Sequence, residues 1–120
     1  MKGFKPVEPK YGKQFGAAGI RLCCRDGKKV DIDVTTSGVT MFFFDLDLTD
    51  FVLDIRRIEQ NKIFDPHKYI DYSPYEGMTM QKGFHGMAVI DMTQSELPEF
   101  LKYANDFIHE VKMRKNEKAA

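Results

Sequence analysis

VTMFFFDL, residues Val39 to Leu46, has the pattern of a β-strand that runs directly into a helix. Asp47 follows as a candidate helix N-cap, with Asp50 three residues later near the positive end of the helix. Apolar residues then recur at helical spacing and predict an amphipathic helix that ends near Gln60-Asn61. These residues are Leu48, Phe51, Val52, Ile55 and Ile58.

The same pattern returns 46 residues later. Met87 to Met92, MAVIDM, reads as a strand, and a second helix follows it. The shift places Asp50 on Glu96 and Ile55 on Leu101. We interpret the chain as two copies of one strand-and-helix unit, which close over each other's open apolar faces. The alternative is that any junction of strand, cap and helix shows this similarity.

The second helix has a continuous apolar stripe at i, i+3, i+4 and i+7 spacing. The stripe consists of Leu97, Phe100, Leu101, Ala104, Phe107, Ile108 and Val111. Two starts are possible for this helix. Thr93 with Glu96 has the spacing of a capping box, whereas Ser95 as N-cap places Pro98 in the first turn, where a missing N–H costs least. We predict Ser95 as the cap.

Further strands follow from alternation and from turn residues. Ala18–Arg25 and Lys29–Thr36 are joined by an Asp26-Gly27 hairpin turn, and Lys68–Tyr72 and Gly77–Lys82 precede the last strand. The predicted fold is α+β, an antiparallel sheet system of about six strands with two helices in the order βββα-βββα. We assign residues 1–16 to a flexible N-terminal arm, 17–114 to a single domain of two repeats (17–61 and 62–114), and 115–120 to a frayed tail.

The composition is that of a folded domain. The 120 residues are 42% hydrophobic with ten phenylalanines, and no apolar run approaches the length of a membrane span. The first 16 residues are charged and lack the apolar segment of a signal peptide. Cys23 and Cys24 are the only cysteines, and neighbours on a strand point to opposite faces, so they are not expected to bridge each other. We predict a cytoplasmic, reducing location without membrane association.

The net charge is zero, but the charges are unevenly placed. Residues 1–29 hold eight basic and two acidic side chains, whereas residues 30–60 hold two basic and seven acidic ones. A cationic strand face with an exposed ring suits single-stranded nucleic acid, because cations hold phosphates and rings stack on bases. We therefore predict a binder of single-stranded RNA or DNA that uses a basic, aromatic β-sheet face, although Asp31 and Asp33 oppose this. The predicted binding residues are Arg21, Arg25, Lys28, Lys29, Phe43, Tyr69 and Lys82.

Enzymatic function is not expected, and we predict no catalytic residue, cofactor or metal. Cys23 and Cys24 lie in no activation motif, and the histidines His67, His85 and His109 are scattered. The sequence has no CxxC, HExxH or EF-hand spacing, and its glycines follow neither the P-loop nor the dinucleotide-binding pattern. The cysteines are interpreted as buried strand residues.

A second function remains open, a protein–protein interaction module such as an assembly subunit or a small inhibitor, without nucleic-acid contact. Zero net charge and the surplus of Phe and Met on the strands favour it. Met78, Met80, Met87 and Met92 in one hairpin would either pack in the core or form an adaptable patch for a partner. A homo-oligomer is expected with either function.

Three stretches carry a resemblance at the level of architecture: GKKVDIDV, VTMFFFDLDLTDF and MAVIDMTQSELPEFL. Duplicated units of antiparallel strands closed by a helix resemble the Whirly and PUR group of single-stranded nucleic-acid-binding domains, over roughly residues 18–114. The nearest equivalent of the plant Whirly stretch KGKAAL is Gly27-Lys28-Lys29-Val30. The resemblance implies strands splayed from a helical core, bases lying on a sheet face, and assembly into oligomers.

Overall fold

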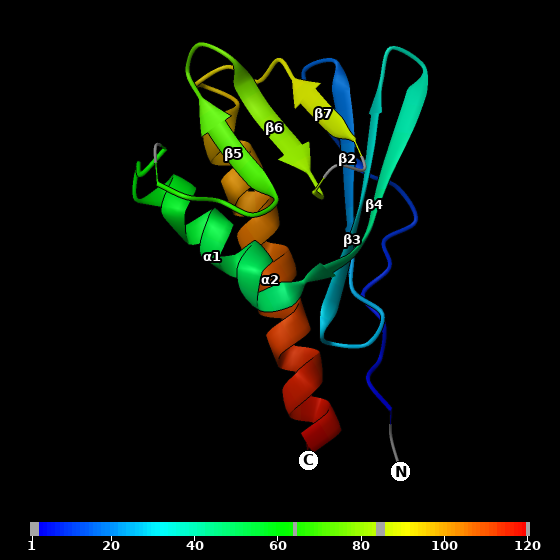
Figure 1. The fold of residues 1–120 in the computed structure, drawn as a ribbon. Coiled ribbons are helices and arrows are strands. Elements are labelled where there is room, and N and C mark those ends of the chain that lie inside the picture. The colour runs from blue at the N-terminus through cyan, green and yellow to red at the C-terminus, as the bar shows by residue number, and fades with distance from the viewer. Residues whose placement is uncertain (1–2, 64, 84–85, 120) are drawn as a thin grey trace.

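A computed structural model describes residues 3–63, 65–83 and 86–119. The fold is α+β, as predicted: two antiparallel sheets, of four and three strands, are each followed by one helix (Figure 1). In chain order the elements are β1 (Lys13–Phe15), β2 (Ala18–Cys23), β3 (Lys29–Thr36), β4 (Val39–Asp47), α1 (Leu48–Glu59), β5 (Ile70–Ser73), β6 (Gly77–Gln81), β7 (Met87–Ile90) and α2 (Leu97–Ala119).

The four-stranded sheet, called sheet 1 here, has the order β1-β2-β3-β4. Its register pairs Ile20 with Val34, and both side chains are buried. The turn from β2 to β3 is the predicted one, because Gly27 has a φ of 78° and the Asp26 carboxylate accepts two backbone hydrogen bonds within it. Alternation along β2 and β3 places one face of sheet 1 on the core and the other toward solvent.

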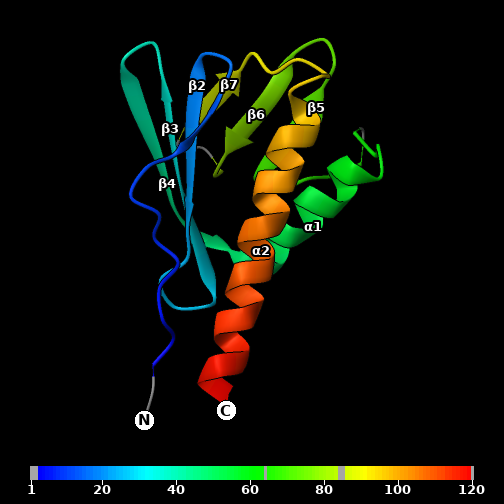
Figure 2. The same cartoon turned by 180° about the vertical axis from the view of Figure 1, so that it is seen from behind.

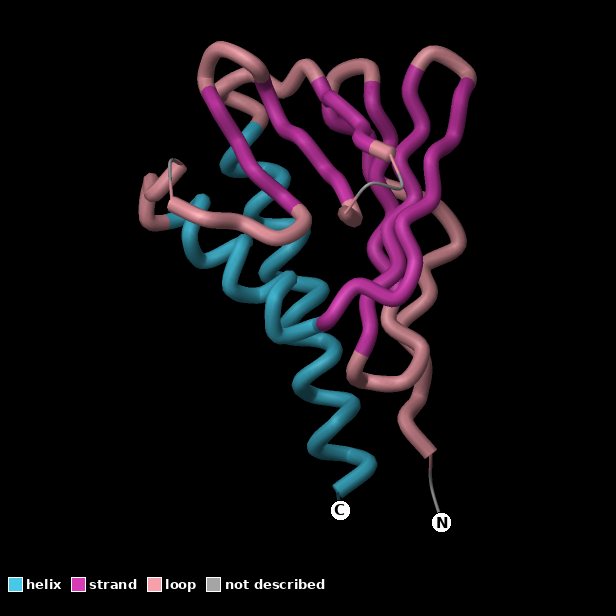
Figure 3. The backbone as a smooth tube through the Cα atoms, in the orientation of Figure 1, coloured by secondary structure: helices cyan, strands magenta, loops and turns pink. Residues whose placement is uncertain are grey.

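The three-stranded sheet, called sheet 2, has the order β5-β6-β7. Lys82, the residue after β6, lies against β4, where its Nζ donates to the Phe44 carbonyl oxygen at 2.5 Å. Sheet 2 therefore lies beside the edge strand β4 of sheet 1, but the two do not join into one sheet. Figure 3 shows them as separate groups of strands, with the helices behind sheet 2 and beside sheet 1.

The start of α1 is the predicted one. The Asp47 side chain accepts a hydrogen bond from the Asp50 N–H at 3.2 Å and is the N-cap. The helix ends at Glu59, and Asn61 takes a left-handed conformation with a φ of 59°. The end of the helix near Gln60-Asn61 is thereby confirmed.

Two buried polar residues of α1 hold the chain that leads into β5. The Asp54 carboxylate accepts hydrogen bonds from the N–H groups of residues 68–70, the shortest at 2.7 Å. Arg57 donates to the carbonyl oxygens of Lys62 and Ile70 at 2.9 and 2.7 Å. These side chains satisfy backbone groups of Lys62 and of residues 68–70 on the side that faces α1, whereas the Tyr69 carbonyl oxygen accepts from the Gln81 N–H of β6.

The start of α2 differs from the prediction. Thr93 Oγ1 accepts from the Glu96 N–H at 3.2 Å, and Glu96 Oε1 accepts from the Thr93 N–H at 3.0 Å. This reciprocal pair is a capping box, so the choice of Ser95 as the cap was wrong. Residues 94–96 form a turn and the helix begins at Leu97, which leaves Pro98 in the first helical turn, where no hydrogen bond is lost.

One hydrophobic core joins the two sheets and the two helices. Phe15 of β1 meets Phe100 of α2 edge to face, with ring centroids 5.6 Å apart, and Phe51 of α1 meets Phe107 of α2 at 5.9 Å. Figure 2 shows α2 crossing α1 and running along sheet 1. Both chain ends lie at the same end of the molecule (Figure 1).

The segments assigned to an arm and a tail each contribute to the described elements. Within residues 1–16, Lys13–Phe15 forms β1, and Val7 pairs with Cys24 through two backbone hydrogen bonds. The Arg114 guanidinium of α2 donates to the carbonyl oxygens of Lys5 and Pro6. The first unit thus has four strands instead of three, and α2 continues to Ala119 through the residues assigned to a frayed tail.

Acid is expected to weaken this fold partly through two carboxyl groups. The backbone N–H of Lys28, followed by that of Lys29, donates to the Asp26 carboxylate and lowers its pKa. The backbone N–H of Thr93 lowers the pKa of Glu96 in the same way. Because each pKa is lower in the folded chain, the stabilisation is present above the ordinary carboxyl pKa of about 4 and is lost as the pH falls through the folded value.

The double variant Asp26→Asn, Glu96→Gln keeps the hydrogen-bond acceptors but cannot titrate. Thermal melts followed by circular dichroism should show a shallower loss of Tm below about pH 4 than in the wild type. Parallel Tm profiles for the two proteins would contradict the assignment.

Among the described residues, no helix is both long enough and apolar enough to cross a membrane.

Candidate nucleic-acid interface

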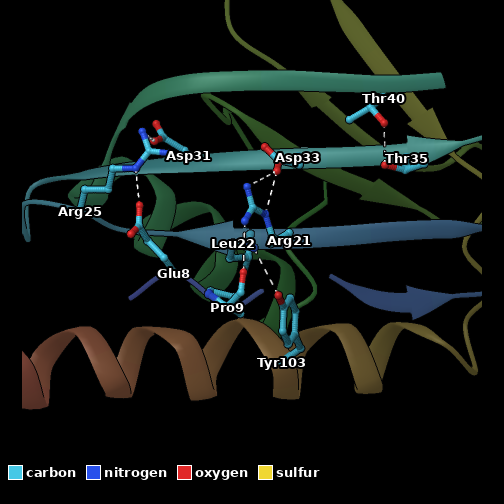
Figure 4. Close-up of polar contacts among 10 residues, drawn as sticks. All are labelled: Glu8, Pro9, Arg21, Leu22, Arg25, Asp31, Asp33, Thr35, Thr40 and Tyr103. Carbon is cyan, nitrogen blue, oxygen red and sulfur yellow. Dashed lines mark hydrogen bonds and ion pairs between the residues drawn. The ribbon is translucent and has the colours of Figure 1, made fainter. Parts of the chain in front are cut away.

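The solvent side of sheet 1, called the outer face, carries charged, polar and aromatic side chains, among them the predicted Arg21 and Arg25. It is formed by Arg21, Arg25, Asp31, Asp33, Thr35, Thr40, Phe42 and Phe44. Figure 4 shows the polar members of this set along β2, β3 and the start of β4, with α2 beyond the edge of β2.

A β-bulge in β4 decides which phenylalanines reach the outer face. The register pairs Val30 with Leu46 and Ile32 with Phe43. Asp31 therefore lies opposite two residues, Phe44 and Asp45. Asp45 has a φ of 58°, a left-handed conformation that Asp tolerates better than most residues, and its N–H donates to Asp31 Oδ1 at 2.9 Å.

The bulge corrects the prediction for Phe43. Strict alternation placed this ring on the outer face, but it is buried, because the extra residue reverses the side on which the preceding residues of β4 lie. Phe42 and Phe44 are outside instead, at 55% and 50% exposure. Their rings stack at a centroid distance of 5.7 Å and an angle of 10°. The outer face thus offers two rings where one was predicted.

The left-handed residue makes the bulge testable. Asp45→Val should lower the free energy of unfolding by about 1–2 kcal/mol, because a β-branched side chain is strained at this φ. Asp45→Gly should be tolerated, since glycine adopts the conformation without a steric cost. Urea denaturation followed by circular dichroism measures both. Equal stability of the two variants would argue against the bulge.

The two predicted arginines lie on the predicted face, and each has acidic partners there (Figure 4). Arg21 contacts Asp33 Oδ2 through Nη2 at 2.6 Å, and this hydrogen-bonded pair raises the pKa of Arg21. Arg25 contacts Glu8 at 2.5 Å and Asp31 at 3.3 Å. Partly exposed pairs of this kind are worth about 0–1 kcal/mol, so a phosphate could take over either guanidinium at small cost.

The three predicted lysines fall in different places. Lys28 and Lys29 are exposed at the β2–β3 turn, at one end of the outer face, and Lys29 Nζ lies 4.0 Å from an Asp47 carboxylate oxygen. Lys82 belongs to the chain after β6 and reaches the far edge of β4. The structure therefore brings Arg21 and Arg25 together, with Lys28 and Lys29 at the end of the same sheet.

Tyr69 is not part of any exposed face. Its ring is buried in the core, and its hydroxyl accepts a hydrogen bond from the Asp47 N–H at 3.1 Å. The prediction that it stacks on a base is therefore wrong. The physical reason is the Asp54 carboxylate, which pulls the backbone of residues 68–70 onto α1 and turns Tyr69 inward.

A depression of about 490 Å³ lies at the end of the outer face nearest β1. Two exposed rings, Tyr11 and Phe42, line it together with the cations Lys10 and Arg21. Its remaining lining consists of small or polar residues: Gly12, Gln14, Gly19, Asp33, Thr35 and Thr40. The depression thus combines stacking surfaces, positive charge and hydrogen-bonding groups.

Neither cysteine thiol is exposed at this interface, although Cys23 lies on the same side of β2 as Arg21. Both side chains are buried thiols, and burial raises the pKa of Cys23 and of Cys24, so both are protonated at neutral pH. In the part of the chain that the structure describes, no three His, Cys, Asp or Glu side chains come together as a metal site. His85 lies outside the described residues.

Sequence reasoning missed Tyr11, Lys10, Phe42 and Phe44. The first two lie in the segment assigned to an arm, and only the pairing of Lys13–Phe15 with β2 brings them onto the sheet. For the phenylalanines, Asp45 was an available signal, because Asp is enriched at left-handed positions where strands bulge.

Comparison with protein-family models, with curated proteins and with solved structures finds no match to this chain, and no family is assigned to it.

Proposed function

We propose that this chain binds single-stranded RNA or DNA without catalysing a reaction, and that the nucleic acid lies along the outer face of sheet 1. The observation that carries the proposal is the presence of exposed rings and cations on one sheet face. Tyr11, Phe42 and Phe44 are half or more exposed. Lys10 and Arg21 line the same depression as Tyr11 and Phe42, and Arg25 lies farther along the same face.

Each kind of group on this face has a role in such binding. A base stacked on an aromatic ring contributes about 1–3 kcal/mol, and the ring accepts any base. Thr35, Thr40 and Gln14 offer hydrogen bonds without charge beside the rings of the depression. The resemblance to the Whirly and PUR group supports the same use of a sheet face.

Acidic neighbours limit how strongly the face attracts phosphates. Asp33 pairs with Arg21, and Glu8 and Asp31 pair with Arg25, whereas Lys10 and Lys28 form no ion pair with the described residues. With two to four phosphates neutralised, log K should fall against log salt with a slope of about −1.4 to −2.8. Stacking then supplies most of the affinity.

Fluorescence anisotropy with a labelled oligo-deoxythymidine and oligo-uridine, from about 50 to 200 mM salt, measures this slope. Binding with the shallow slope supports the proposal. Absence of binding at the lowest salt rejects it. A much steeper slope would place the contact on a more basic surface than the outer face.

A second function, a protein-interaction module, is favoured by the first half of β4, which precedes the contact of Lys82 with Phe44. This nine-residue strand is the last of sheet 1. Among the described strands, the backbone of residues 39–43 pairs with β3 alone. Val39, the first residue of this strand, is 63% exposed. Two such edges could pair in antiparallel fashion across a twofold axis and form a homodimer.

Light scattering after size-exclusion chromatography tests the second function. A dimer that Val39→Lys converts to a monomer would support pairing through β4, because an edge lysine opposes strand addition. A wild-type monomer at all concentrations would reject it. Since the oligonucleotide experiment is independent of this result, the two functions are tested separately.

A further inference from the structure

A groove between α1 and α2 lies away from the outer face of sheet 1. It has a volume of about 240 Å³ and is lined by apolar residues of both helices. Val52, Ile108 and Val111 are wholly or partly buried, whereas Leu53 is 60% exposed. An exposed leucine beside a buried apolar stripe leaves apolar surface that a partner could cover.

The two ends of the groove are chemically different. At one end a polar cluster ties the helices together: Arg56 Nη1 donates to Asn105 Oδ1 at 2.5 Å, and Asn105 Nδ2 donates to Glu59 Oε2 at 2.9 Å. At the other end Lys112 and Lys115 line the groove. Neither lysine pairs with an acidic side chain among the residues described. The groove is therefore an apolar channel with a cationic end.

We infer that this groove docks an amphipathic helical segment of a partner protein, with apolar side chains against Leu53 and Val52 and acidic side chains against Lys112 and Lys115. Charge complementarity selects the acidic character of the segment. The volume is below the roughly 300–1,000 Å³ of small-molecule pockets, which favours one or two inserted side chains over an enclosed ligand. A helix laid in a groove uses apolar anchors at i, i+3 or i+4, and i+7.

The probe is a synthetic helical peptide with leucines at that spacing and glutamates on its flanks. A matched peptide carries lysines in place of the glutamates. Two-dimensional ¹H–¹⁵N NMR of the full chain should show shifts confined to residues 48–53 and 108–115 with the acidic peptide, and at least about tenfold weaker binding of the basic one.

Substitutions test whether the peptide binds in the groove or elsewhere on α2. Leu53→Glu should weaken binding of the acidic peptide by about tenfold or more, and so should the double variant Lys112→Glu, Lys115→Glu. Met113→Glu is the control, because Met113 is exposed on α2 but does not line the groove. Circular dichroism confirms that each variant is folded.

Three outcomes would overturn the inference: no shifts with the acidic peptide up to about 1 mM, equal binding of both peptides, or binding of anionic phospholipid vesicles but not of the peptide. Because the groove and the outer face share no residue, loss of oligonucleotide binding would leave this test unaffected.

Discussion

Asp54→Ala should lower the free energy of unfolding by at least about 3 kcal/mol, because three backbone N–H groups, two of them buried, would lose the carboxylate that accepts their hydrogen bonds. For a domain of this length the expected loss of Tm is about 10 °C or more. The effect should be global, since the carboxylate joins α1 to the chain entering β5 and sheet 2 depends on that junction.

Asp50→Ala is the matched control. Asp50 lies on the same helix, but its carboxylate is about one-third exposed, and its ion-pair partner among the described residues is Lys68, at 3.4 Å. Its loss should cost less than about 1 kcal/mol. Urea denaturation measures both variants. A change below about 1 kcal/mol for Asp54→Ala would mean that residues 68–70 do not depend on this carboxylate.

Removal of two rings should have the largest effect on nucleic-acid binding. The double variant Tyr11→Ala, Phe42→Ala is expected to weaken oligo-deoxythymidine binding by about 2–6 kcal/mol, the sum of two stacking contributions. Both rings are exposed, at 75% and 55%, so the fold should be unaffected. Fluorescence anisotropy at low salt gives the affinity, and thermal melts verify the fold.

Tyr75→Ala controls for the loss of an exposed aromatic side chain. Tyr75 is 96% exposed at the turn between β5 and β6, in sheet 2. Its substitution should leave the affinity for the oligonucleotide unchanged. If Tyr75→Ala weakened binding as much as the double variant, the oligonucleotide would not lie on the outer face. If neither had an effect, stacking would not be the source of the affinity.

Most elements of the fold could be predicted from local patterns. Val30, Ile32 and Val34 alternate with polar residues in β3, and all three are buried on one side, because the extra residue of the bulge belongs to β4 and not to β3. The Asp47 cap and the Gly27 turn also follow from single residues with specific backbone roles. Such features need no information from elsewhere in the chain.

The parts that sequence reasoning missed depend on contacts distant in sequence. The bulge at Asp45 is set by pairing with Asp31, and Tyr69 is turned inward by Asp54 of α1. The segment around Tyr11 joins the sheet only because β1 pairs with β2. Alternation within one strand cannot reveal an inserted residue in its pairing with another, and this explains the error at Phe43.

The most direct test of nucleic-acid binding on the outer face is a ¹H–¹⁵N NMR titration of the ¹⁵N-labelled chain with a short oligo-deoxythymidine. We expect shifts in residues 10–14, 19–25, 33–35 and 40–44, together with little change in sheet 2. Shifts confined to sheet 2 or to the α1–α2 groove, or none at low salt, would contradict it.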